Sequence, residues 1–144
     1  MSAASEPVAA APIATAHLRV ARPSRDLARA QTFWTQGLGM QVLWRSPVGD
    51  EHDLLMLGWP EAAWHLELVA DSAVQPAPTE EDLLVLYLGA PASQDLEQRI
   101  AAAGGRRVAS RNPYWDEWGS TFEDADGYRI VLSHRTWDNR SDRG

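Results

Sequence analysis

The segment Thr121-Phe-Glu-Asp-Ala-Asp-Gly-Tyr-Arg-Ile-Val-Leu132 decides how this chain folds. Residues 119–123 and 128–133 both read as strands, and Asp124-Ala-Asp-Gly127 lies between them. An Asp-Gly pair between two strand-like runs is a strong signal for a tight hairpin turn. We therefore expect a hairpin here, and the rest of the chain can be compared with it.

The same order of elements occurs twice along the chain. Ser24-Arg-Asp-Leu27 and Ser93-Gln-Asp-Leu96 each begin an amphipathic stretch that follows an apolar, strand-like run. A pair of glycines follows each stretch, and each half ends in another strand-like run. Self-similarity of this kind indicates a duplicated structural unit. The sequence therefore predicts two β-α-β-β-β modules.

The expected elements follow from apolar periodicity and from turn residues. In the first half, Ser24 is the expected N-cap of the helix, and Gly37 is the residue that ends it. The strands of that half are expected at 17–21, 40–44, 54–57 and 64–69. In the second half we expect a helix over 95–103 and strands at 83–88, 106–110, 119–123 and 128–133.

The fold class predicted from this pattern is α+β, with the two modules in tandem forming one domain. Curved mixed sheets are expected to enclose a central cleft, with the helices outside. The expected divisions are a flexible tail (1–14), a first module (15–70), a linker (71–82), a second module (83–136) and a C-terminal tail (137–144).

Composition excludes several kinds of chemistry. A net charge of -7 argues against nucleic acid and anionic membranes as partners. The chain has no Cys, and all 13 basic residues are Arg, so thiolate and lysine Schiff-base chemistry are excluded. The N-terminus lacks the features of a signal peptide or a membrane span, so we expect a cytoplasmic protein.

From residue 17 to residue 136, the chain resembles the vicinal oxygen chelate superfamily, which includes glyoxalase I, bleomycin-resistance proteins and extradiol dioxygenases. The order of elements, the stretch Gly37-Leu-Gly-Met40 and the Asp-Gly-Tyr turn carry this resemblance. It implies a homodimer, and in metal-using members one ligand on the first and last strand of each module. Those positions hold His17, Glu67, Leu83 and Val131 here. The last two cannot bind a metal.

Side-chain alternation predicts which residues face the cleft. Leu66 and Leu68 should face the helices, which leaves His65 and Glu67 toward the cleft. In the first strand, Leu18 and Val20 should likewise face the helices. The expected cleft then has a polar wall (His17, Arg19, His65, Glu67 and Arg129) and an apolar wall (Leu83, Val85, Tyr87 and Val131). Such a pocket suits a small organic ligand, and the two arginines favour a carboxylate or phosphate on it.

Three roles remain open for the polar wall. His17, His65 and Glu67 form a two-histidine, one-carboxylate set that could bind a divalent metal such as Fe, Ni, Mn or Zn. Alternatively, Glu67 pairs with Arg19 or Arg129, with His17 hydrogen-bonded to the carboxylate. In a third interpretation without metal, the catalytic residue Glu67, beside a catalytic His17 or beside His65, abstracts a proton next to a carbonyl, and an arginine polarises the oxygen.

Aromatic residues cluster in the expected loop at 112–118. Tyr114, Trp115 and Trp118 could cover the cleft or stack on a planar ligand, or could pack against a sheet edge or a dimer partner. Trp34 is predicted to be core, and Trp44 and Trp59 to be packing residues.

The sequence thus favours a protein that binds a small anionic or planar organic molecule and needs no metal cofactor. A divalent-metal-dependent lyase, isomerase or dioxygenase is the alternative.

Overall fold

A computed structural model describes residues 9–47 and 53–140. The predicted tails at 1–14 and 137–144 therefore lie partly outside the described residues. The first module contains β1 (Leu18–Pro23), α1 (Leu27–Thr32), η1 (Phe33–Gly37), β2 (Gln41–Arg45), β3 (Asp53–Gly58) and β4 (Trp64–Ala70). The second contains β5 (Leu83–Tyr87), α2 (Gln94–Ala102), β6 (Arg106–Val108), α3 (Pro113–Glu117), β7 (Gly119–Glu123) and β8 (Arg129–Ser133). The predicted α+β class with two tandem modules is confirmed.

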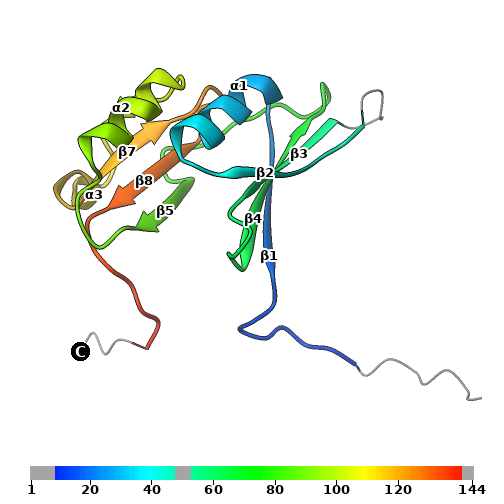
Figure 1. Cartoon of the computed structure of the whole chain (residues 1–144), viewed down its shortest axis with the longest axis horizontal. Helices are drawn as coiled ribbons and strands as arrows, with labels where there is room; N and C mark the ends of the chain where they lie inside the picture. Colours follow the sequence, from blue (N-terminus) through cyan, green and yellow to red (C-terminus); the bar gives the residue numbers. More distant parts are fainter. Residues whose placement is uncertain (1–8, 48–52, 141–144) are drawn as a thin grey trace, which may run out of the picture.

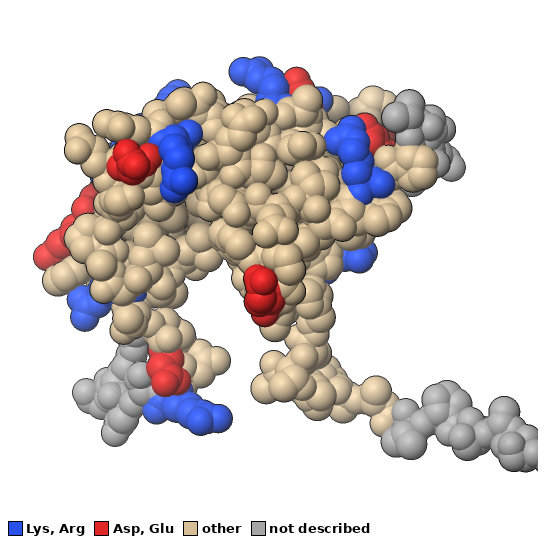
Figure 2. Space-filling model, in the orientation of Figure 1, with Lys and Arg blue, Asp and Glu red and all other residues tan. Residues whose placement is uncertain are grey.

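Each module has its own four-stranded mixed sheet. The strand orders are β1-β4-β3-β2 and β5-β8-β7-β6, and the first pair in each sheet is parallel. The two sheets do not close into one: they diverge beneath the helices, and the molecule is notched between their far ends (Figures 1 and 2).

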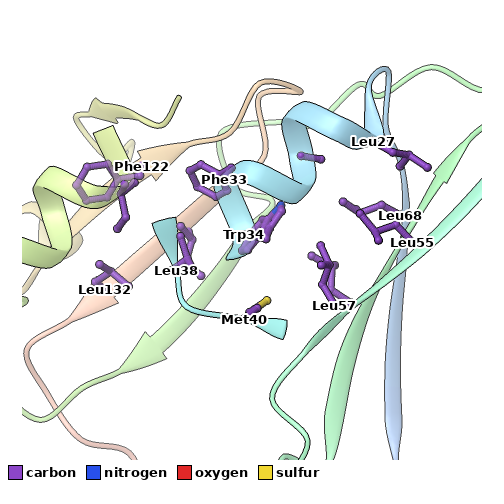
Figure 3. Close-up of a cluster of buried hydrophobic side chains, with 14 residues drawn as sticks. Leu27, Phe33, Trp34, Leu38, Met40, Leu55, Leu57, Leu68, Phe122 and Leu132 are labelled. Carbon is purple, nitrogen blue, oxygen red and sulfur yellow. The ribbon is translucent and has the colours of Figure 1, made fainter. Parts of the chain in front are cut away.

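One hydrophobic core serves both modules. Trp34 lies near its centre, with Leu55 and Leu57 of the first sheet on one side and Phe122 and Leu132 of the second on the other (Figure 3). The core-facing sides of both sheets therefore contribute to the same cluster. The opposite side of each sheet, called here its outer face, is turned away from that cluster. Within one chain, the two outer faces thus do not form the two walls of a single cleft.

The start of α1 differs from the prediction. Asp26, and not Ser24, is the N-cap, and its side chain accepts a hydrogen bond from the Arg29 N–H. Ser24 instead donates its hydroxyl to Asp126 of the second module at 2.6 Å. A capping residue is present near the expected position, but Ser24 bonds to a distant segment and does not serve as the cap.

The expected loop at 112–118 contains the short helix α3. Asn112 is its N-cap and accepts a hydrogen bond from the Tyr114 N–H, and Pro113 occupies the first turn. Both residue types are favoured at these positions. The Asn-Pro pair is therefore a helix-start signal here, and the expected loop is in part a short helix.

Two apolar side chains are exposed where burial was expected. Leu18 is 60% exposed because it lies at the end of β1 remote from α1 (Figure 1). Trp44 is 47% exposed on the edge strand β2 and is not the expected packing residue. Trp59 does pack: its ring lies 6.3 Å from that of Trp64, and its indole donates to the Gly39 carbonyl.

The Asp-Gly-Tyr turn links the two modules. Asp126 accepts hydrogen bonds from the Ser24 hydroxyl and from the Arg25 N–H, and the Tyr128 hydroxyl donates to the Pro23 carbonyl. The turn between β7 and β8 is thus hydrogen-bonded to the first module just before α1. No helix among the described residues has the length and apolar character needed to cross a bilayer.

Candidate functional site

Four of the five residues predicted for the polar wall lie together on the outer face of the first sheet. β1 and β4 are parallel neighbours, and their register places Arg19 beside His65 and Ala21 beside Glu67. Alternation keeps Arg19 and Ala21 on one face of β1, and His65 and Glu67 on the same face of β4. His17 directly precedes β1 and contacts His65 on this face. The predicted orientation of these residues, away from the leucines of the core, is confirmed.

The four side chains form a connected chain of contacts. Arg19 Nε donates to His65 Nε2 at 3.1 Å, and Arg19 Nη1 lies 3.4 Å from Glu67 Oε1. His17 Nε2 and His65 Nδ1 are 2.7 Å apart. Glu67 therefore pairs with Arg19, one of its two expected partners. His17 is bonded to His65, whereas the expectation placed it against Glu67.

Burial and hydrogen bonding both favour the neutral form of His65. Burial lowers its pKa below the usual value, and the nearby charge of Arg19 lowers it further, while Glu67 opposes the shift. An arginine Nε–H can only donate, so the Nε2 atom of His65 must be unprotonated to accept it. The electrostatics and the hydrogen bonding therefore agree.

An apolar hollow of about 220 Å³ lies one step further along the same strands. Its walls are formed by Ala21, Arg22 and Pro23 of β1, by Val69 of β4, and by Asp71 and Val74 beyond it. Because Ala21 and Pro23 follow Arg19 at intervals of two, the hollow adjoins the Arg19–Glu67 pair. A cationic group and an apolar recess are thus neighbours.

Leu43, Trp44 and Met56 extend the outer face on the other side. Trp44 is the cross-strand partner of Met56, and Met56 is the partner of Glu67. Trp44 and Met56 therefore lie on the same face as Glu67. The register shifts between Val42 and Trp44, and such a bulge can turn two successive residues to one side. Simple alternation along β2 could not have placed both Leu43 and Trp44 on this face. Their only sequence signal was a run of large apolar residues in an edge strand.

The second-module residues lie elsewhere. Arg129 is not joined to Glu67: its Nε donates at 3.0 Å to Oε2 of Glu123, its cross-strand partner on β7. Val131 is fully buried on the outer face of the second sheet. Leu83 and Val85 are half-buried beside it. The structure therefore separates Arg129 from the other predicted polar residues.

The predicted aromatic residues gather around the second module. Tyr87 and Trp115 have ring centroids 6.4 Å apart, and Tyr114 meets Trp115 edge to face at 5.0 Å. The Arg135 guanidinium lies 4.5 Å over the ring of Trp118. Tyr87, Tyr114 and Trp115 thus pack against one another, and all four aromatic residues belong to the second module, whereas His17 and Glu67 belong to the first.

The donor set of the polar residues does not fit the metal that the superfamily implies. No three His, Asp or Glu side chains of the described residues converge as metal ligands. The imidazole nitrogens are bonded to each other and to a guanidinium, and the Glu67 carboxylate faces the same fixed cation. Leu83 and Val131 supply no ligand atoms.

Two family models match this chain. The YycE-like N-terminal domain matches residues 18–69, and the YycE-like C-terminal domain matches residues 81–134. The uncharacterized protein YycE of Bacillus subtilis (strain 168) is 34% identical over 120 residues, which cover 81% of this chain and 86% of that protein.

Solved structures agree with these matches. A crystal structure of Bacillus subtilis YycE, described as of unknown function and as a candidate glyoxalase/fosfomycin resistance protein, has a TM-score of 0.75 at 30% identity, covering 88% of this chain and 95% of that one. Trypanothione-dependent glyoxalase I of Leishmania major gives 0.61 at 22%, covering 81% and 84%. The antibiotic binding protein TnmS3 of Streptomyces sp. CB03234 gives 0.59 at 22%, covering 87% and 100%. The last two show a shared fold only.

Proposed function

The chain belongs to the YycE-like family of the vicinal oxygen chelate superfamily, and from this premise we propose that it binds a small organic anion on the outer face of its first sheet. The ligand places a carboxylate, phosphonate or phosphate group at Arg19. Its apolar part enters the hollow lined by Ala21, Arg22, Pro23, Val69, Asp71 and Val74, against the apolar side chains among them.

One observation carries this proposal: a half-exposed guanidinium lies beside an apolar recess. The Arg19 side chain is 51% exposed, although it already contacts His65 and Glu67. Its remaining N–H groups can therefore reach an incoming anion. A recess with few polar groups gains binding energy from apolar area, while one charged contact sets the orientation.

A binding role also agrees with the chemistry of the neighbouring residues. A metal-dependent lyase, isomerase or dioxygenase would need free ligand atoms on His17 and Glu67, and both side chains are engaged. TnmS3, which shares the fold, is described as antibiotic binding, so binding without a named reaction has a precedent on this scaffold.

A panel of small acids tests the proposal. Thermal unfolding is measured with aliphatic and aromatic carboxylates and phosphonates, and with matched uncharged amides. We expect several acids, but not their amides, to raise the midpoint, because binding to the native state stabilises it. Arg19→Met should abolish these shifts, and Arg107→Met, which alters an exposed ion pair on β6, should keep them. Equal shifts in the Arg19 variant would refute the proposed site.

We further propose that a second copy of the chain completes this face. Leu43 and Trp44 are exposed apolar residues on the outer face that carries Arg19 and Glu67. The outer faces of the two sheets in one chain do not meet, because both sheets turn their other side to the shared core. Apolar surface of this kind commonly marks an interface.

Trp44→Glu tests the homodimer. A buried charge without a partner opposes association, so we expect light scattering to show a dimer for the native chain and a monomer for the variant. Trp137→Glu, at an exposed tryptophan outside both sheets, is the control and should remain dimeric. A monomeric native chain would contradict the proposal.

A further inference from the structure

We propose that Arg19 selects against divalent metals at this site by fixing the proton of His65 on the nitrogen that faces His17. The inference rests on the proposed anion-binding function, because it assigns to one residue the choice between an anion and a metal cation.

The direction of each hydrogen bond follows from Arg19. Its Nε–H donates to His65 Nε2, so that nitrogen uses its lone pair as an acceptor. A neutral imidazole carries one N–H, which must then be on His65 Nδ1. This N–H donates to His17 Nε2 across 2.7 Å, so the proton of His17 is on its Nδ1. Both imidazole lone pairs are therefore occupied.

A metal would need the opposite proton arrangement. To bind one ion together, His17 Nε2 and His65 Nδ1 must both be unprotonated, and Arg19 places the proton between them. The distance itself is close to suitable: two nitrogens on one tetrahedral Zn²⁺ are about 3.4 Å apart, so an opening of about 0.7 Å would suffice. Arg19 also adds a fixed positive charge that repels a second cation.

Glu67 would become available in the absence of Arg19. Its side chain is only 12% exposed, and Arg19 supplies the cation beside it. A mostly buried carboxylate that loses its cation is unfavourable and gains from any replacement. The native arrangement has the reverse preference, because the guanidinium N–H groups of Arg19 and the Nδ1–H of His17 are donors and attract an anion.

Cobalt titration tests this inference. Co²⁺ is added to the native chain and to Arg19→Ala, and binding is followed by calorimetry and by visible absorption, which reports tetrahedral coordination. We expect Arg19→Ala to bind one Co²⁺ per site at least ten-fold more tightly than the native chain. Adding His65→Ala to Arg19→Ala should abolish the gain, and Arg107→Ala alone should not produce it.

Three results would overturn the inference: equal Co²⁺ affinity in the native chain and the Arg19 variant, absence of binding in both, or a gain that survives loss of His65. Circular dichroism checks folding, and Arg19→Met, which keeps the length of the apolar stem, is the second variant. Nitrogen chemical shifts of the native chain give a direct reading that needs no variant. We expect His65 protonated at Nδ1, and protonation at Nε2 would contradict the inference. Because these measurements use no organic ligand, their failure is distinguishable from failure of the acid panel.

Discussion

Asp124 lies in an environment that raises the pKa of its carboxyl group. It is buried in the turn between β7 and β8, where Oδ1 accepts hydrogen bonds from the Asp126 and Tyr128 N–H groups. Burial, and then the charge of Asp126, raise its pKa to about 6. The Tyr128 and Asp126 N–H groups and the Trp34 indole oppose this rise. Among the described residues, Trp34 Nε1 and Asp124 Oδ2 each lack a hydrogen bond of normal geometry.

Asp124→Asn should change how stability depends on pH. Because the folded-state pKa is raised from 3.8, the native chain is favoured by protonation of Asp124 below about pH 4 and loses that stabilisation as pH rises through 6. The variant should not show this decrease, which amounts to about 3 kcal/mol in the free energy of unfolding at pH 7.5. Urea unfolding at pH 4 and pH 7.5 measures this difference, with the exposed Asp95→Asn as control. An equal effect of Asp124→Asn at both pH values would show that the charge is unimportant.

At the scale of elements, two helical segments determine how closely the modules approach. Gly105 follows α2 and lies against Ile100 of α2 and Phe33 of η1. A Cβ atom at Gly105 would be 2.5 Å from Ile100 Cγ2 and 2.8 Å from Phe33 Cε2. Gly104 serves a different purpose: its φ is +94°, and no atom lies within 4 Å of its would-be Cβ.

Gly105→Ala should therefore destabilise the protein through packing. We expect a loss of about 1–3 kcal/mol in the free energy of unfolding, as for overpacked cores. Gly104→Ala is the matched variant, and the left-handed backbone alone should cost about 1 kcal/mol. Urea unfolding of both compares the two causes. A Gly105 variant as stable as the native chain would show that Ile100 and Phe33 readily move aside.

At the scale of the whole molecule, a single carboxylate connects sequence segments about one hundred residues apart. Asp126 belongs to the second module, and it accepts hydrogen bonds from Ser24 and from the Arg25 N–H of the first. All of these contacts lie at the start of α1, next to the shared core. The two modules are therefore joined by polar contacts as well as by apolar packing.

Asp126→Ala should weaken this connection. Removal of the carboxylate leaves the Ser24 hydroxyl and the Arg25 N–H without their acceptor, which we expect to cost about 2–3 kcal/mol. Chemical unfolding measures the loss, and hydrogen exchange should show faster exchange at the start of α1. Asp138→Ala, at an exposed position, is the control. A loss no larger than that of the control would show that apolar packing alone holds the modules.

Much of the fold and part of the site could be predicted from the sequence. Alternation in 64–69 placed His65 and Glu67 on one face, because strand periodicity is a local property. The partner of Glu67 remained ambiguous between Arg19 and Arg129, since only strand pairing decides it. Trp44 and Met56 were missed because a bulge and a cross-strand register place them there.

The sequence by itself determined the repeat, the order of elements and the absence of metal ligands at Leu83 and Val131, since these depend on residue identity and on local periodicity. Only the tertiary structure decided that the two sheets share one core and turn their outer faces away from it. It also decided that Arg19 lies between His65 and Glu67. Both results depend on how distant segments pack, which local patterns do not encode.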